Sequence, residues 1–158
     1  MDLEDRIAKA VELFRSGYNC SQSVVGAFAD MYGFNHEQAM HMSASFGAGI
    51  GRMRLTCGAA CGLFMLAGLE RCAIQGSDRV GKMANYALVQ ELAAEFKKRN
   101  GTLQCANLLG LKKPEGTYVP EERTEQYYAK RPCPRIIEEA ARIWVEHLQQ
   151  NDALAKNE

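Results

Sequence analysis

Four of the six cysteines stand where helices are expected to begin, and this placement is the strongest chemical signal in the sequence. They are Cys20, Cys57, Cys105 and Cys133. The unpaired backbone amides of a first helical turn, together with the helix dipole, favour a thiolate over a thiol. Thiolates are the nucleophiles of disulfide exchange and the ligands of zinc and iron. The pattern therefore predicts metal ligation or thiol redox chemistry, with Cys57 as the catalytic thiolate in the second case.

Small residues surround Cys57. The segment CGAACG places Gly58 and Gly62 inside an expected helix, where each glycine costs about 1 kcal/mol relative to alanine. The segment SFGAGIG lies just upstream, is expected to form a loop, and contributes Gly49. Close approach of a cofactor, a partner helix or another cysteine would account for these glycines. We expect Gly49, Gly58 and Gly62 to border a bound cofactor.

The remaining candidate ligands give weaker signals. Cys61 follows Cys57 by four residues on the same helical face, so it is either a further metal ligand or a small buried apolar side chain. Cys72 stands beside Arg71 at a helix end, where the dipole opposes a thiolate. The histidines are interpreted as ordinary surface or partly buried residues, and the methionines as core residues.

The elements that must position these cysteines have strongly helical patterns and almost no strand pattern. Capping residues and glycines give the expected boundaries. We expect helices between Asp2 and Gly17, from Ser21 to Tyr32, from Asn35 to the SFGAGIG segment, from Cys57 after its cap Thr56 to Arg71, from the cap Ser77 to Asn100, and from the cap Thr102 to Leu109.

The segment from Lys112 to Arg131 carries prolines and a glycine and is expected to run over the surface, with one helical turn at Thr124–Ala129. A last helix is expected at Pro132, because proline is favoured in the first helical turn. The chain has no repeat, low-complexity segment or linker. It therefore predicts a single all-α domain over residues 1–158, a compact multi-helix bundle of about six helices.

Composition excludes several classes of partner. Nineteen basic residues balance nineteen acidic ones, so no net charge attracts nucleic acid or an anionic membrane. No apolar run reaches about 18 residues, and the first residues lack the pattern of a signal peptide. We expect no nucleic-acid partner, no membrane partner and a cytoplasmic location. In that compartment the cysteines would be reduced rather than joined in structural disulfides.

The cysteine spacing resembles the family of redox-active proteins named for the pattern C_GCAxxG_C_C. The matching pieces are GYNCSQSVVGAF at Cys20, FGAGIGR followed by CGAACG at Cys57, CANLLG at Cys105, and RPCPRIIEEAARI at Cys133. They extend from about Gly17 to Val145. At the second cysteine the chain reads TCGA, where the pattern has glycine before the cysteine and alanine after it.

The resemblance implies a small, largely helical protein of prokaryotic type in which Cys20, Cys57, Cys105 and Cys133 are the characteristic cysteines. The family is also similar to part of the split-Soret cytochromes, which bind an iron–sulfur cluster as well as haem. The CxxCH motif of haem attachment is absent from this sequence, so only the cluster would be inherited.

Our leading hypothesis is that the four cysteines, with Cys61 as an additional candidate, ligate an iron–sulfur cluster of the [2Fe–2S] type. The chain would then be an electron carrier, a redox sensor or a component of an oxidoreductase. Three alternatives stay open: thiol–disulfide chemistry without a metal, a structural four-cysteine zinc site, and a helical interaction protein with buried thiols. We expect a redox partner protein, and a homodimer is compatible with the exposed segment at 112–131.

Overall fold

Helices make up 71% of the chain in the computed structural model, which describes residues 1–113 and 115–157 and contains no strand in those residues. Six helices have eight residues or more, so the predicted all-α bundle is confirmed. These are α1 (Leu3–Arg15), α2 (Cys20–Phe28), α3 (His36–Ser43), α5 (Gly58–Glu70), α6 (Arg79–Asn100) and α9 (Cys133–Lys156). Shorter elements are α4 (Gly47–Ile50), α7 (Cys105–Leu108), α8 (Glu125–Lys130) and two 3₁₀ turns, Ala29–Tyr32 and Ala44–Phe46.

Side-chain caps fix several helix starts where the sequence predicts them. Asp2 accepts a hydrogen bond from the Asp5 amide at 2.8 Å and begins α1. Asn35 and Gln38 form the predicted capping box before α3. Asn19 forms a second capping box that begins α2 at Cys20, one residue earlier than predicted. These local bonds satisfy amides that have no partner inside the helix.

Other boundaries differ from the predictions. Asp78, rather than Ser77, caps α6, because its carboxylate accepts the Gly81 amide at 2.9 Å. The Thr102 hydroxyl accepts the amide of Gln104 two residues later, so it closes a turn and α7 begins only at Cys105. The SFGAGIG segment, predicted as a loop or a close backbone approach, forms a 3₁₀ turn and then α4, in which Ala48 and Gly49 have left-handed rather than helical dihedral angles and the backbone at Gly49 lies close to its neighbours.

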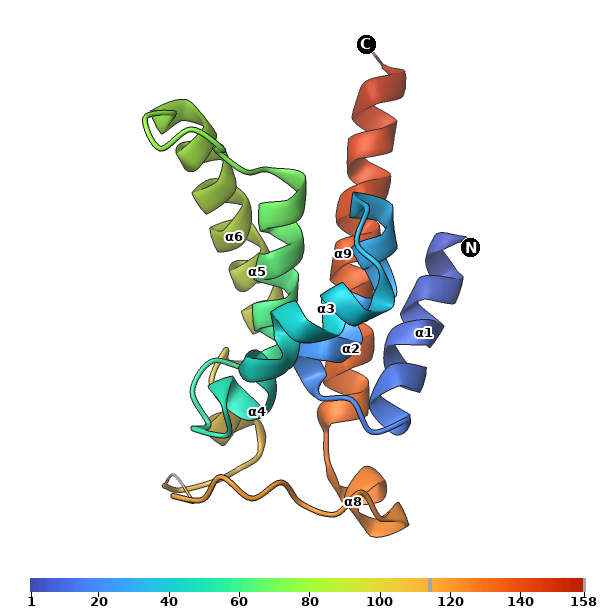
Figure 1. Ribbon diagram of the computed structural model, residues 1–158, viewed down its shortest axis with the longest axis vertical. Helices are drawn as coiled ribbons and strands as arrows, with labels where there is room; N and C mark the ends of the chain where they lie inside the picture. Colours follow the sequence, from blue (N-terminus) through green and yellow to red (C-terminus); the bar gives the residue numbers. More distant parts are fainter. Residues whose placement is uncertain (114, 158) are drawn as a thin grey trace.

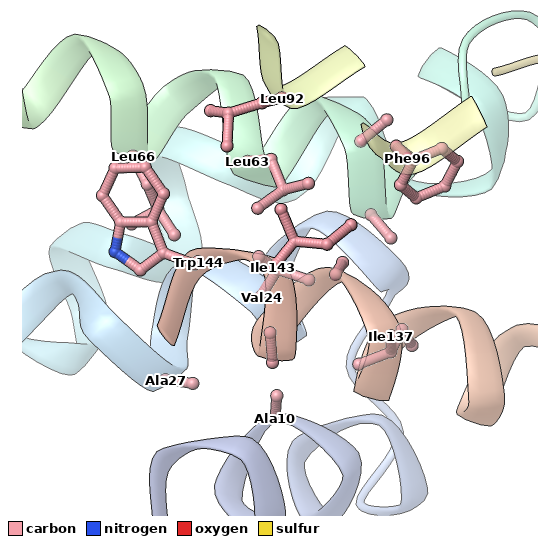
Figure 2. Close-up of a cluster of buried hydrophobic side chains, with 14 of the residues drawn as sticks. Ala10, Val24, Ala27, Leu63, Leu66, Leu92, Phe96, Ile137, Ile143 and Trp144 are labelled. Atoms are coloured by element: carbon pink, nitrogen blue, oxygen red, sulfur yellow. The ribbon is translucent and has the colours of Figure 1, made fainter. Parts of the chain in front are cut away.

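The core lies between α1, α2, α5, α6 and α9 (Figure 2). Trp144 of α9 is fully buried, and Leu63, Leu66 and Phe96 pack in the same cluster. Gly62 lets α5 approach α2 closely, because a Cβ on Gly62 would lie 2.8 Å from the Val24 Cβ. Burial of these apolar side chains is the main force that holds the five helices together.

Helices α5 and α9 begin at the same end of the bundle, the lower end in Figure 1. Helices α4 and α8 and the extended part of residues 115–131 also lie at this end. The starts of α5 and α9, each marked by a cysteine, therefore lie at the end of the bundle that residues 115–131 cover.

Among the described helices, none combines the length and hydrophobicity of a bilayer-spanning segment.

Candidate functional site

Four cysteines from distant parts of the sequence line one small cavity of about 50 Å³ at the lower end of the bundle. Cys20, Cys105 and Cys133 are the first residues of α2, α7 and α9, and Cys57 is the cap residue before α5. The four thiols are close enough that each one influences the ionisation of others in the set. The fold thus gathers into one cavity the four helix-start cysteines that the sequence singles out.

A two-residue bridge positions Cys57 and Cys105. Thr56 and Gln104 pair as an isolated antiparallel bridge. The Cys57 amide donates to the Leu103 carbonyl at 2.7 Å, and the Cys105 amide donates to the Leu55 carbonyl at 2.6 Å. Because each cysteine is bonded through its backbone to the segment that precedes the other, their separation is fixed by main-chain hydrogen bonds.

A left-handed turn forms another wall of the cavity. Residues 48–52 all have positive φ angles, from 56° at Ala48 to 75° at Gly49, and they include the non-glycine residues Ile50 and Arg52. Such backbone strain is often found at functional sites. A Cβ on Gly49 would lie 2.7 Å from the Cys105 Cβ, so only glycine lets the turn approach that cysteine.

The three glycines expected at a cofactor site have different surroundings. Gly49 and Gly58 line the cavity, and a Cβ on Gly58 would lie 2.9 Å from the Phe46 carbonyl and 3.1 Å from the Cys20 Cβ. Gly62 lies outside the cavity at the contact between α2 and α5. The cost of glycine in a helix is thus offset at Gly62 by helix packing.

Burial opposes the ionisation that helix starts were expected to favour. It raises the pKa of Cys57 to about 12, although the amides of Ala59 and Ala60 lower it as the helix-start prediction requires. Burial also raises the pKa of Cys105, even though the Arg54 guanidinium donates to its Sγ at 3.7 Å and lowers it. Removing a thiolate from water outweighs a few aligned amides. The predicted effect of the helix start is therefore present at Cys57, but burial outweighs it there.

Cys133 is the exception. A hydrogen bond from Cys20 lowers the pKa of Cys133 to about 7 against the effect of burial, and Arg131, Arg54 and Arg123 lower it further. The same hydrogen bond raises the pKa of Cys20 well above its ordinary value. The two thiols therefore share one proton as a pair. The surroundings favour a thiolate at Cys133 rather than at Cys57, the expected nucleophile.

Arginine and tyrosine side chains complete the cavity, and the sequence patterns did not identify them as site residues. Arg54, Arg123, Arg131 and Tyr127 line it together with apolar side chains. The Arg123 guanidinium donates to the carbonyls of Phe14 and Tyr18 and lies 4.9 Å from the centre of the Tyr127 ring. Arg54 lies three residues before Cys57, and Arg131 lies two residues before Cys133. This closeness in sequence is the feature that could have identified them as site residues.

Cys61 and Cys72 are not part of the cavity lining. Cys61 is buried beside the Thr56 carbonyl, 3.9 Å from its Sγ, and burial raises its pKa to about 11. Cys72 is exposed beyond the end of α5. Within residues 1–113 and 115–157, no three His, Cys, Asp or Glu side chains form a group that could hold a metal ion.

Comparison with known proteins assigns the family. No curated protein and no solved structure matches the chain. Residues 18–147 match the family described as "Putative redox-active protein (C_GCAxxG_C_C)". This match covers all four cysteines of the cavity and most of the chain, and it agrees with the resemblance in the sequence. The chain therefore belongs to the C_GCAxxG_C_C family of redox-active proteins.

Proposed function

We propose that the cavity lined by Cys20, Cys57, Cys105 and Cys133 is a redox centre that holds an iron–sulfur cluster of the [2Fe–2S] type. One observation carries the proposal: four thiols from four separate helix starts meet in one cavity, while the other two cysteines lie elsewhere. Four thiolates are the usual ligand set of such a cluster. Bound there, the cluster would accept and release single electrons for electron transfer or redox sensing.

The family description favours a cluster over a structural zinc ion. Four cysteines can hold either group, but zinc has no redox chemistry, whereas the family is described as redox-active. Cys20 and Cys133 influence each other's ionisation, and Cys57 and Cys105 are joined through the Thr56–Gln104 bridge. These four residues would hold the cluster, which would supply one-electron redox chemistry.

The surrounding residues have defined roles in this proposal. Phe14, Leu108 and Ile136 line the cavity and exclude water. Arg54 and Arg131 lie near the sulfur atoms and would stabilise negative charge on them, which raises a reduction potential. The proposal includes a cytoplasmic location, where the thiols stay reduced, and a partner protein that exchanges electrons with this centre.

Anaerobic purification and reconstitution with ferrous iron and sulfide test the proposal. We expect visible absorption bands and about two irons and two sulfides per chain, as in a [2Fe–2S] centre. Separate replacement of Cys20, Cys57, Cys105 and Cys133 by serine should abolish or strongly reduce the bound iron. Matched controls are Cys61→Ser and Cys72→Ser, which should retain the iron and the absorption of the unaltered protein.

Two outcomes would contradict the cluster. The unaltered protein could remain colourless and iron-free after anaerobic reconstitution. Alternatively, Cys61→Ser could lose as much iron as Cys57→Ser while the helical circular dichroism of both variants stays intact, which would move the ligand set away from the cavity.

A second candidate function is thiol–disulfide exchange, favoured because Cys20 and Cys133 line one cavity and shift each other's pKa in opposite directions. The Cys133 thiolate would attack a substrate disulfide, forming a mixed disulfide and releasing one substrate thiol. Cys20, after losing its proton, would then attack the Cys133 sulfur and release the second substrate thiol. The substrate disulfide is thereby reduced, and the Cys20–Cys133 pair is oxidised to a disulfide.

Peptide mapping of metal-free protein in glutathione redox buffers separates this candidate from the cluster. A reversible disulfide between Cys20 and Cys133, with one measurable reduction potential, is the expected result for thiol exchange. If this pair stays reduced across the buffer range, or if the disulfide forms between other cysteines, the second candidate is wrong.

A further inference from the structure

A second, larger cavity of about 280 Å³ adjoins the cysteine cavity, and its lining is strongly basic. Arg52, Arg54, Arg123 and Arg131 all line it, and Glu121 is the only acidic residue among the lining residues described. Three of the four arginines also line the cysteine cavity. The two cavities therefore share a wall of guanidinium groups.

The acidic residues nearby neutralise only part of this charge. Glu115 lies 2.9 Å from the Arg54 Nε and 3.5 Å from Arg52. Glu121 contacts Arg131 and lies 3.6 Å from Arg52 and 3.9 Å from Arg54. Arg123 instead donates to main-chain carbonyls, which carry no formal charge. Four guanidinium groups thus face two carboxylates and the thiolate that the surroundings favour at Cys133, so the wall keeps an excess of positive charge.

Arg52 supplies a donor without a partner. Its side chain is only 10% exposed, and its Nη1 is buried without any hydrogen-bond acceptor among the described residues. Its Nη2 makes only long contacts with Glu115 and Glu121. A buried donor with no acceptor is unfavourable, so the hydrogen-bonding capacity of Arg52 is not used up by the described residues. Arg52 also has a positive φ of 64°, a strained backbone conformation for a non-glycine residue.

We infer that this arginine-lined cavity binds a small-molecule anion that carries two or more carboxylate or phosphate groups, next to the redox centre. Guanidinium groups bind such planar or tetrahedral oxyanions through paired hydrogen bonds. The excess of positive charge favours an anion over a neutral ligand. A volume of about 280 Å³, just below the usual range for ligand pockets, suits a small metabolite.

This inference goes beyond the proposed redox function. It does not need the cluster, because the arginines that line the cavity are not ligands of the cluster. An anion held there would lie across the shared guanidinium wall from Cys105 and Cys133. It is therefore placed to act as a substrate or effector of the adjacent thiols.

Calorimetric titration with sodium pyrophosphate and with sodium malonate tests the inference, with the purified protein at fixed ionic strength. Saturable binding with one site per chain is expected for at least one probe. Arg52→Gln should weaken that binding about tenfold or more, because it removes a charged donor. Arg52→Lys, which keeps the charge but loses the paired geometry, should weaken it less. Arg79→Gln, at the exposed start of α6, is the matched control and should bind like the unaltered protein.

Absence of saturable binding to both probes would overturn the inference. So would equal weakening by Arg52→Gln and Arg79→Gln, since that result indicates a general charge effect. Circular dichroism verifies the folding of Arg52→Gln. If Arg52→Gln does not fold, the binding measured for Arg52→Lys tests the inference instead. Cluster reconstitution is scored separately by iron content, so each proposal can fail without the other.

Discussion

Cys57 and Cys133 both stand at helix starts, yet their surroundings move their pKa values in opposite directions. Burial raises the pKa of Cys57 to about 12. The hydrogen bond from Cys20 and the charges of three arginines lower the pKa of Cys133 to about 7. At the residue scale, a specific donor and nearby positive charge decide ionisation, whereas helix-start amides alone do not overcome burial.

In the reduced, metal-free protein, we expect the alkylation rate of Cys133 to rise with a midpoint near pH 7. Cys20→Ala removes the stabilising hydrogen bond and should move that midpoint upward, towards the ordinary value of 9.0. Peptide mass spectrometry after pulses of iodoacetamide at different pH values measures both midpoints. Cys61→Ala, outside the cavity, should leave the Cys133 midpoint unchanged, and an equal shift in that control would refute the assigned cause.

The same pKa has a consequence for stability in the metal-free protein. The pKa of Cys133 in the folded protein lies below its ordinary value, so ionisation of this thiol adds to the free energy of unfolding. The full contribution is present above pH 9. This contribution is lost as the pH falls through about 7. Ionisation of Cys57 has the opposite effect on the free energy of unfolding, because its pKa is raised in the folded protein. Stability is unaffected by ionisation of this thiol below pH 9 and falls as the pH rises from 9 towards 12.

At the scale of elements, the left-handed turn at residues 48–52 controls how closely the chain approaches Cys105. Both Gly49 and Gly51 have positive φ, but only Gly49 is in close contact with its surroundings. A Cβ on Gly49 would lie 2.6 Å from the Arg54 Cα, whereas the nearest atom to a Cβ on Gly51 is 3.9 Å away. Substitutions at these two glycines therefore distinguish the cost of backbone strain, which both carry, from the cost of steric contact, which only Gly49 carries.

Gly51→Ala should lower the free energy of unfolding by about 1 kcal/mol, the order of the cost of a left-handed conformation for alanine. Gly49→Ala carries that cost and a backbone clash, so we expect a loss of about 3 kcal/mol and reduced iron binding. Urea unfolding of both variants measures the difference. Equal losses would show that the close approach to Cys105 has no energetic importance.

At the scale of the whole molecule, Arg123 attaches the surface segment at 112–131 to the end of α1. Its guanidinium donates to the Phe14 carbonyl at 3.0 Å and to the Tyr18 carbonyl at 3.1 Å, and it lies 4.3 Å from the centre of the Phe14 ring. Tyr128 adds a hydrogen bond to the Arg15 carbonyl, and Glu115 and Glu121 pair with Arg52 and Arg54, so Arg123 is one of several contacts that hold this segment on the bundle.

Arg123→Ala should loosen the attachment of this segment without unfolding the bundle. Hydrogen bonds to a charged donor contribute about 1.5–3 kcal/mol, so amide exchange in residues 115–130 should accelerate about tenfold or more. Hydrogen–deuterium exchange with mass spectrometry measures this, and core peptides of α5 and α9 should keep their protection. Arg142→Ala, which loses only long surface ion pairs, is the control. Unchanged exchange in residues 115–130 would show that other contacts hold the segment.

The sequence by itself determined the helices and the cysteines that stand at their starts. Helix periodicity and caps are local properties, so Asp2, Asn35 and Gln38 act in the structure as their spacing predicts. The pattern at Cys20, Cys57, Cys105 and Cys133 likewise placed the chain in its family, which residues 18–147 confirm. These signals lie within a few neighbouring residues or in the order of residues along the chain.

Only the tertiary structure decided which groups meet. The pairing of Cys20 with Cys133, the wall of arginines and the packing role of Gly62 depend on contacts between segments far apart in sequence. The pKa values follow from the same contacts, because burial and opposing charge are set by the packing of all the helices together. The spacing of residues along one chain does not give the distances between segments that are far apart in sequence. The pKa of each thiol could therefore be assigned only from the fold.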